Sequence, residues 1–133
     1  MTSDVNIAID VMGNDKGPEV IIKASSISKT RYPDIKYTYF GDSKVITKYV
    51  KKYANLIGSY QILHTEEEVL PEDKPTLALR KRKKSSMGRA LAYLKEKKVE
   101  ALVSAGNTGA LMAMSKLELR MLEGILRPAI AAT

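Results

Sequence analysis

One stretch of the sequence, from Val99 to Leu122, constrains the fold more than any other part of the chain. It opens with a short apolar run that ends at Val103, as expected for a strand buried on both faces. The small and turn-forming residues of Ser104–Gly109 follow, and apolar residues then recur at helical spacing. We therefore predict a buried strand over Val99–Ser104, a tight glycine loop and a helix. The helix face is formed by Leu111, Met112, Ser115, Leu119 and Leu122.

The loop over Ser104–Gly109 is the first candidate for a binding site. A strand, a glycine loop and a helix in this order direct free backbone N–H groups and a positive helix end toward one point. Such a point suits an anion, typically a phosphate. Gly106 and Gly109 allow close backbone approach, while Asn107 and Thr108 can donate hydrogen bonds or cap the helix. An ordinary strand-to-helix turn with an Asn or Thr cap explains the same residues, because two glycines are a weak signal.

The beginning of the chain repeats this pattern. Val5–Asp10 is predicted to be a strand, and the loop that follows contains Gly13 and ends at Pro18. Proline suits the first turn of a helix, so we expect a helix from there to near Lys29. Asp10 stands at the carboxyl end of its strand, where open parallel sheets bind ligands. A carboxylate that only caps the loop is the alternative for Asp10.

Strands and helices alternate along the whole chain. Ile35–Phe40 and Tyr60–His64 are two further predicted strands, and Asp42 or Ser43 caps the helix between them. This alternation predicts an α/β domain with a mainly parallel sheet and helices on both faces. The glycine loops should then lie at one end of the sheet, with the Ser85-Ser86 pair facing the same cleft. We interpret His64, the sole histidine, as structural.

A run of five cations, Arg80–Lys84, separates an irregular segment over Leu70–Ala78 from the Ser85-Ser86 helix start. Such a run is usually solvated surface. The chain has 22 basic and 15 acidic residues, a net charge of +7, so the run can also bind phosphate or an acidic protein. Nucleic acid is the third option. The candidates for partner contact are Arg80, Lys81 and Arg82.

Composition excludes several classes of function. The absence of cysteine excludes disulfides, thiol catalysis and thiolate metal sites, and a single histidine argues against zinc. We expect neither a metal nor a cofactor. No apolar run reaches transmembrane length and none resembles a secretion signal, so we expect a soluble cytoplasmic protein. Arg127–Thr133 reads as the start of a further strand.

Six blocks of the sequence, taken in order, resemble the bacterial acyl-(acyl carrier protein):phosphate acyltransferase family. The blocks are Ile7–Glu19, Gly41-Asp42, Asp73–Pro75, Lys84–Met87, Val103–Leu111 and Arg127–Ala129. The block that contains Asn107 is the most specific. In the first loop, Asn14, Asp15 and Lys16 stand where the family usually has Gly and then Asp-His, so no histidine role carries over to this loop.

The resemblance implies transfer of a long acyl chain from acyl carrier protein to inorganic phosphate, giving acyl phosphate for phospholipid synthesis. It implies a Rossmann-like three-layer α/β/α sandwich, usually homodimeric, and it allows peripheral membrane association of the full-length protein. Family members are far longer. We therefore expect residues 1–133 to be the N-terminal part of a single acyltransferase domain, apparently truncated and inactive alone.

Direct attack by phosphate is the simplest chemistry, because the chain has no cysteine and no apparent Ser-His-Asp constellation. The proposed catalytic residues are Asp10, Lys74 and Asn107. The proposed phosphate or substrate contacts are Gly13, Lys84, Ser85, Ser86, Gly106, Asn107, Thr108 and Gly109. A basic α/β module that binds nucleic acid through Arg80–Lys84 remains the alternative function.

Overall fold

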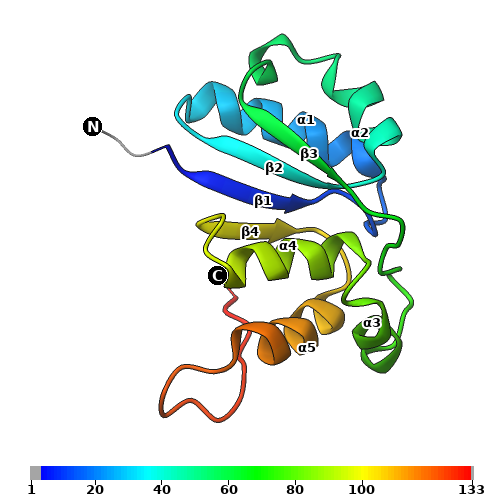
Figure 1. The fold of residues 1–133 in the computed structure, drawn as a ribbon, viewed down its shortest axis with the longest axis vertical. Coiled ribbons are helices and arrows are strands. Elements are labelled where there is room, and N and C mark those ends of the chain that lie inside the picture. Colours follow the sequence, from blue (N-terminus) through cyan, green and yellow to red (C-terminus); the bar gives the residue numbers. More distant parts are fainter. Residues whose placement is uncertain (1–3, 133) are drawn as a thin grey trace.

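The described residues form a sheet of four strands that all run in the same direction, in the order β3-β2-β1-β4 (Figure 1). The computed structural model describes residues 4–132. The strands are β1 (Asn6–Asp10), β2 (Lys36–Gly41), β3 (Tyr60–His64) and β4 (Ala101–Ser104). The four predicted strands and their parallel pairing are confirmed, with ends shifted by at most two residues.

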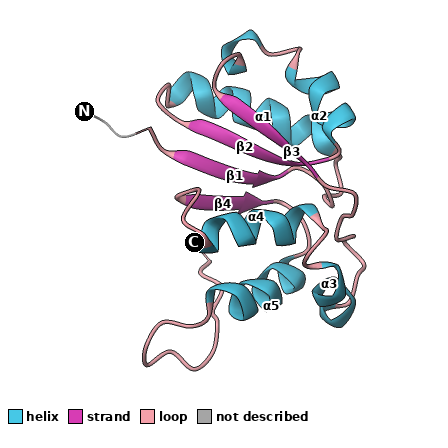
Figure 2. Ribbon diagram, viewed as in Figure 1, coloured by secondary structure: helices cyan, strands magenta, loops and turns pink. Residues whose placement is uncertain are grey.

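Helices cover both faces of the sheet (Figure 2). Helices α1 and α2, with the short 3-10 helix η1, lie on one face, and α4 lies on the other. Helix α5 packs against α4, and α3 packs against α5. The bounds are α1 (Pro18–Arg31), α2 (Ser43–Val50), η1 (Ala54–Leu56), α3 (Pro75–Lys81), α4 (Ser86–Lys95) and α5 (Thr108–Leu119). The predicted α/β class is confirmed.

Alternating side chains of the central strands fill the two halves of the core. Ile9 and Tyr39 pack with residues of α1 and α2. Their neighbours Ala8 and Phe40 pack on the opposite face with Ala90 of α4. Because side chains alternate along a strand, β1 and β2 must be apolar at almost every position to be covered on both sides.

The prediction that Val99–Ser104 is buried on both faces is wrong. Within residues 4–132, β4 pairs only with β1 and forms one edge of the sheet. Its residue Leu102 packs against the α4 side, but Val103 is 53% exposed. Val103 lines an apolar hollow with Ile7 and Ile21. A run of apolar residues alone does not reveal on how many sides a strand has neighbours.

Three other local predictions need correction. Leu70–Ala78 is not irregular throughout, because Pro75 starts α3. In the first turn of a helix the backbone N–H groups have no helical acceptor, so proline costs no hydrogen bond there. Helix α5 ends at Leu119, since Arg120 has a positive φ of 65°. Its buried residues are Ala110 and Met114 rather than the predicted face.

The predicted terminal strand is also absent from the described part of the chain. Residues 127–132 are exposed and form no strand, and Thr133 lies outside the described residues. Across residues 4–132, no helix is both long and apolar enough to cross a membrane.

Candidate active site

The two glycine loops meet at the carboxyl end of the sheet. β1 and β4 are parallel neighbours, and their last residues, Asp10 and Ser104, are paired in register. The loops that follow therefore leave the sheet side by side. A Cβ placed on Gly106 would lie 3.3 Å from the carbonyl oxygen of Gly13, so the two backbones are almost in contact. The predicted convergence of the loops is confirmed.

Asp10 joins three segments at this point. Ser86 Oγ donates to Asp10 Oδ1 at 2.6 Å, and Ser104 Oγ donates to Asp10 Oδ2 at 2.8 Å. The Gly106 N–H in turn donates to Ser104 Oγ at 3.2 Å. Asp10 is only 2% exposed, and this burial raises the pKa of its carboxyl group, against the opposing effect of the two serine hydrogen bonds. Both carboxylate oxygens thus hold the loop after β4 and the start of α4 against β1.

Ser85 and Ser86 have their hydroxyls in internal hydrogen bonds. Ser85 is fully buried and caps α4, its Oγ accepting from the Gly88 N–H at 3.2 Å. Ser86, 1% exposed, donates its hydroxyl to Asp10, while its backbone N–H donates to the Glu67 carbonyl at 3.0 Å. The sequence predicts that both serines contact phosphate or substrate. In the structure they fix the position of α4.

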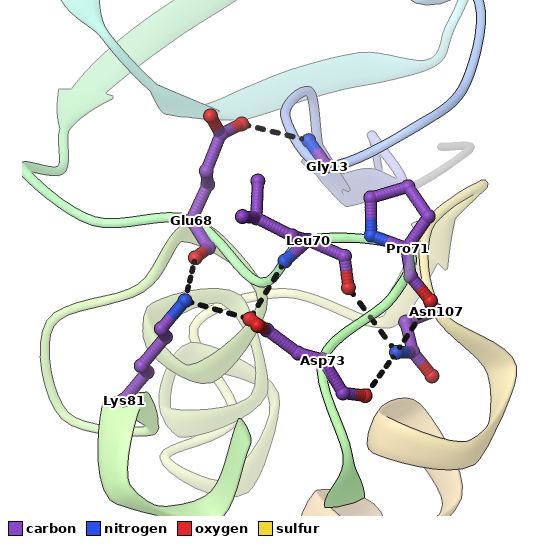
Figure 3. Close-up of polar contacts among 7 residues, drawn as sticks. All are labelled: Gly13, Glu68, Leu70, Pro71, Asp73, Lys81 and Asn107. Carbon is purple, nitrogen blue, oxygen red and sulfur yellow. Dashed lines mark hydrogen bonds and ion pairs between the residues drawn. The ribbon is translucent and has the colours of Figure 1, made fainter. Parts of the chain in front are cut away.

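Asn107 is the N-cap of α5 and also holds a distant segment. Its Oδ1 accepts from the Ala110 N–H at 3.0 Å, which is the capping bond predicted as one of its roles. Its Nδ2 lies 3.2, 3.1 and 2.8 Å from the carbonyl oxygens of Leu70, Pro71 and Asp73 (Figure 3). The two amide hydrogens are therefore shared among three acceptors. The side chain links α5 to residues 68–73, which we call the strap.

The strap also contacts the first glycine loop. Glu68 Oε2 accepts from the Gly13 N–H at 3.0 Å (Figure 3). Gly13 has a φ of 71°, and a Cβ there would lie 2.1 Å from the carbonyl oxygen of Val69. Both the backbone conformation and the lack of space for a side chain therefore require glycine. Strap residues were missed as site residues because no local pattern marks them. Only Asp73 belonged to a block that carried the family resemblance.

Exposed candidate residues gather beside the start of α5. The N–H groups of Thr108 and Gly109 occupy the first turn of α5, where a helix offers them no acceptor. Gly109 lies next to α3, since a Cβ on it would be 3.6 Å from Pro75 Cγ. Lys74, which precedes Pro75, is exposed. The backbone of the exposed Lys74 is therefore close to the first turn of α5, whose exposed N–H groups and positive helix end suit an anion.

The cations of the five-residue run differ in their surroundings. Lys81 points inward to Asp73, and Arg82 Nε lies 3.7 Å from Glu118 Oε1. Lys83 and Lys84 are exposed and line a hollow of about 250 Å³ that also includes Arg89, His64, Thr65 and Glu66. Lys84 is thus near His64 at the end of β3 rather than at the start of α5.

Comparison with known proteins decides the family. The family model described as "Fatty acid synthesis protein" matches residues 5–133. This chain belongs to that family. Similar proteins named phosphate acyltransferase include those of Xanthobacter autotrophicus, 47% identical over 99% of this chain, and Rhodopseudomonas palustris strain BisA53, 50% identical over 99%. The matches cover 37% and 38% of those relatives, so the chain spans little more than a third of their length.

The resemblance found in the six sequence blocks is therefore confirmed. In this member of the fatty acid synthesis protein family, the matched region includes both glycine loops, the strap and the start of α5. The whole geometry described above lies within the part shared with the phosphate acyltransferases.

Proposed function

We propose that this chain supplies part of the active site of an enzyme that transfers a long acyl group from an acyl carrier protein to inorganic phosphate. The observation that supports the proposal is the exposed first turn of α5, which lies close to Pro75 and the preceding Lys74 and follows directly on the second glycine loop. The names of the relatives give the reaction class. We take residues 1–133 as part of a single acyltransferase domain and the acyl phosphate as a precursor for phospholipid synthesis.

In this proposal the phosphate is the nucleophile. Lys74 Nζ and the N–H groups of Thr108 and Gly109 hold its oxygens, which keeps another oxygen free for attack. That oxygen forms a bond to the thioester carbonyl carbon, the C–S bond breaks, and the thiolate leaves and takes a proton from water. Asp10 and Asn107 act by fixing the loops, because their polar atoms are engaged within the protein.

The carrier protein, an acidic partner, would meet the exposed cations of the basic run. Arg80, Lys83 and Lys84 are suited to this role, whereas Lys81 and Arg82 are engaged with Asp73 and Glu118. The family match and the relatives reported above favour acyl transfer over a nucleic-acid module. A homodimer, a cytoplasmic location and peripheral membrane association of the full-length protein remain part of the proposal.

A chimeric enzyme tests the reaction. Residues 1–133 replace the matched part of the Xanthobacter autotrophicus relative, and acyl phosphate formed from acyl carrier protein and phosphate is trapped with hydroxylamine. We expect turnover, with the KM for phosphate raised about tenfold by Lys74→Met, a loss typical of a hydrogen bond to a charged group. Lys52→Met, which removes an exposed cation paired with Glu19, is the control. An active chimera in which Lys74→Met leaves the KM for phosphate unchanged would contradict the proposed site.

A further inference from the structure

The strap is the one described segment that is hydrogen-bonded to both the Gly13 loop and the Asn107 side chain. It bonds the first loop through Glu68 and the second through the carbonyls of Leu70, Pro71 and Asp73. These contacts join residues 34 to 55 positions apart in the sequence. The strap therefore bridges the two loops, which the pairing of β1 with β4 already brings side by side (Figure 3).

The strap itself is held from the α3 side by one cation. Lys81 Nζ donates to Asp73 Oδ2 at 2.6 Å and to the Glu68 carbonyl at 3.2 Å. It therefore bonds the first and the last residue of the strap. Asp73 Oδ2 also accepts from the Leu70 N–H at 2.9 Å, which closes a turn inside the strap. The single ammonium group thus connects to residues that contact each of the two loops.

This ion pair is more enclosed than the others in the described chain. The side chains of Lys81 and Asp73 are 24% and 6% exposed, against 50% and 48% for the Lys52–Glu19 pair at a similar distance. Solvent screens an exposed pair strongly, so its removal changes little. Removal of one partner from an enclosed pair leaves a charge that must regain solvent, and here the strap would have to move for that to happen.

We propose that Lys81 and Asp73 are positioning residues that lock the strap and thereby set the phosphate-binding geometry at the start of α5. The inference rests on the proposed function, since it names residues that shape that same site. It removes Lys81 from the partner-binding cations and gives it an internal role. Asp73 acts on the site through its carbonyl, which accepts from Asn107, and through its carboxylate, which binds Lys81.

The test measures phosphate binding and loop protection in the same variants of the 133-residue chain. Inorganic phosphate is the probe, and hydrogen exchange is read by mass spectrometry on peptides that contain Gly13 and Ala110, whose N–H groups depend on Glu68 and Asn107. For Lys81→Met we expect faster exchange in both peptides, unchanged exchange in β2, and phosphate affinity about tenfold weaker. Lys81→Arg should restore both, and Lys52→Met should change neither.

Asp73→Asn gives an independent variant that keeps the side-chain shape, in case Lys81→Met fails to fold. It should weaken phosphate binding to a similar degree, and combining it with Lys81→Met should add little, because both changes break one interaction. If phosphate binds Lys81→Met as well as the unsubstituted chain, the inference is overturned while the proposed function stands. If the unsubstituted chain shows no phosphate binding, the proposed function fails instead, and the inference with it.

Discussion

At the scale of single residues, the site depends on small groups placed where larger ones would collide. Gly13 combines a positive φ with a backbone oxygen in the space that a Cβ would occupy. Gly58 has a similar φ of 77° but nothing within 4 Å of a Cβ. The pair therefore separates the cost of backbone strain from the cost of a collision.

We expect Gly58→Ala to lower the free energy of unfolding by about 1 to 2 kcal/mol, the usual cost of a left-handed non-glycine residue. Gly13→Ala should lower it by at least about 3 kcal/mol, because the strap must also move away from the new methyl group. Urea denaturation of the two variants measures both values. Equal losses in the free energy of unfolding would show that the strap moves away from the new methyl group at little energetic cost.

At the scale of elements, helix starts fix the loops. Asp42 caps α2 with its Oδ1 2.8 Å from the Lys44 nitrogen, and Asn107 caps α5 in the same manner. Both caps can be recognised in the sequence. The difference between them is tertiary, because only the Asn107 side chain has a second set of partners in a distant segment.

The two caps should therefore differ when truncated. Asp42→Ala is expected to lower the free energy of unfolding by about 1 kcal/mol, the typical cost of a lost N-cap. Asn107→Ala should lower it by about 2 to 3 kcal/mol, because it also leaves strap carbonyls without their donor. Chemical denaturation followed by circular dichroism measures both losses. Similar losses for the two variants would mean that the strap bonds add no stability.

At the scale of the whole molecule, the sheet is asymmetric. β2 is buried along Tyr37–Gly41, whereas β4 has an unpaired edge within the described residues and carries the exposed Val103. Val103 and Ile21 also line an apolar hollow of about 200 Å³ on the α1 side of that edge. An open strand edge beside apolar surface favours association with another chain.

We therefore expect the 133-residue chain to self-associate and to show no acyl transfer to phosphate by itself. Val103→Lys should shift it toward monomer, because a charged side chain on an edge strand opposes pairing. Sedimentation velocity at several concentrations measures the change, and Leu126→Lys, an exposed apolar position far along the terminal segment, is the control. A monomeric unsubstituted chain with full turnover would contradict the expectation.

The sequence by itself determined the local structure of this protein. The apolar runs of β1 and β2, the proline that starts α1, and the caps Asp42 and Asn107 are encoded by neighbouring residues, because strand period, fixed proline φ and capping geometry are local properties. The order of strands and helices then required a parallel sheet, and the parallel sheet brought Asp10 and Ser104 to one edge.

Only the tertiary structure decided which side chains contact one another around the candidate site. Lys81 lies in a run of five cations, and nothing nearby in the sequence distinguishes it from Lys83, yet it alone of the two faces Asp73 and Glu68. The edge position of β4 and the reach of Asn107 to the strap likewise depend on elements far apart in the chain. Such pairings follow from the packing of helices on the sheet, which no short stretch of residues contains.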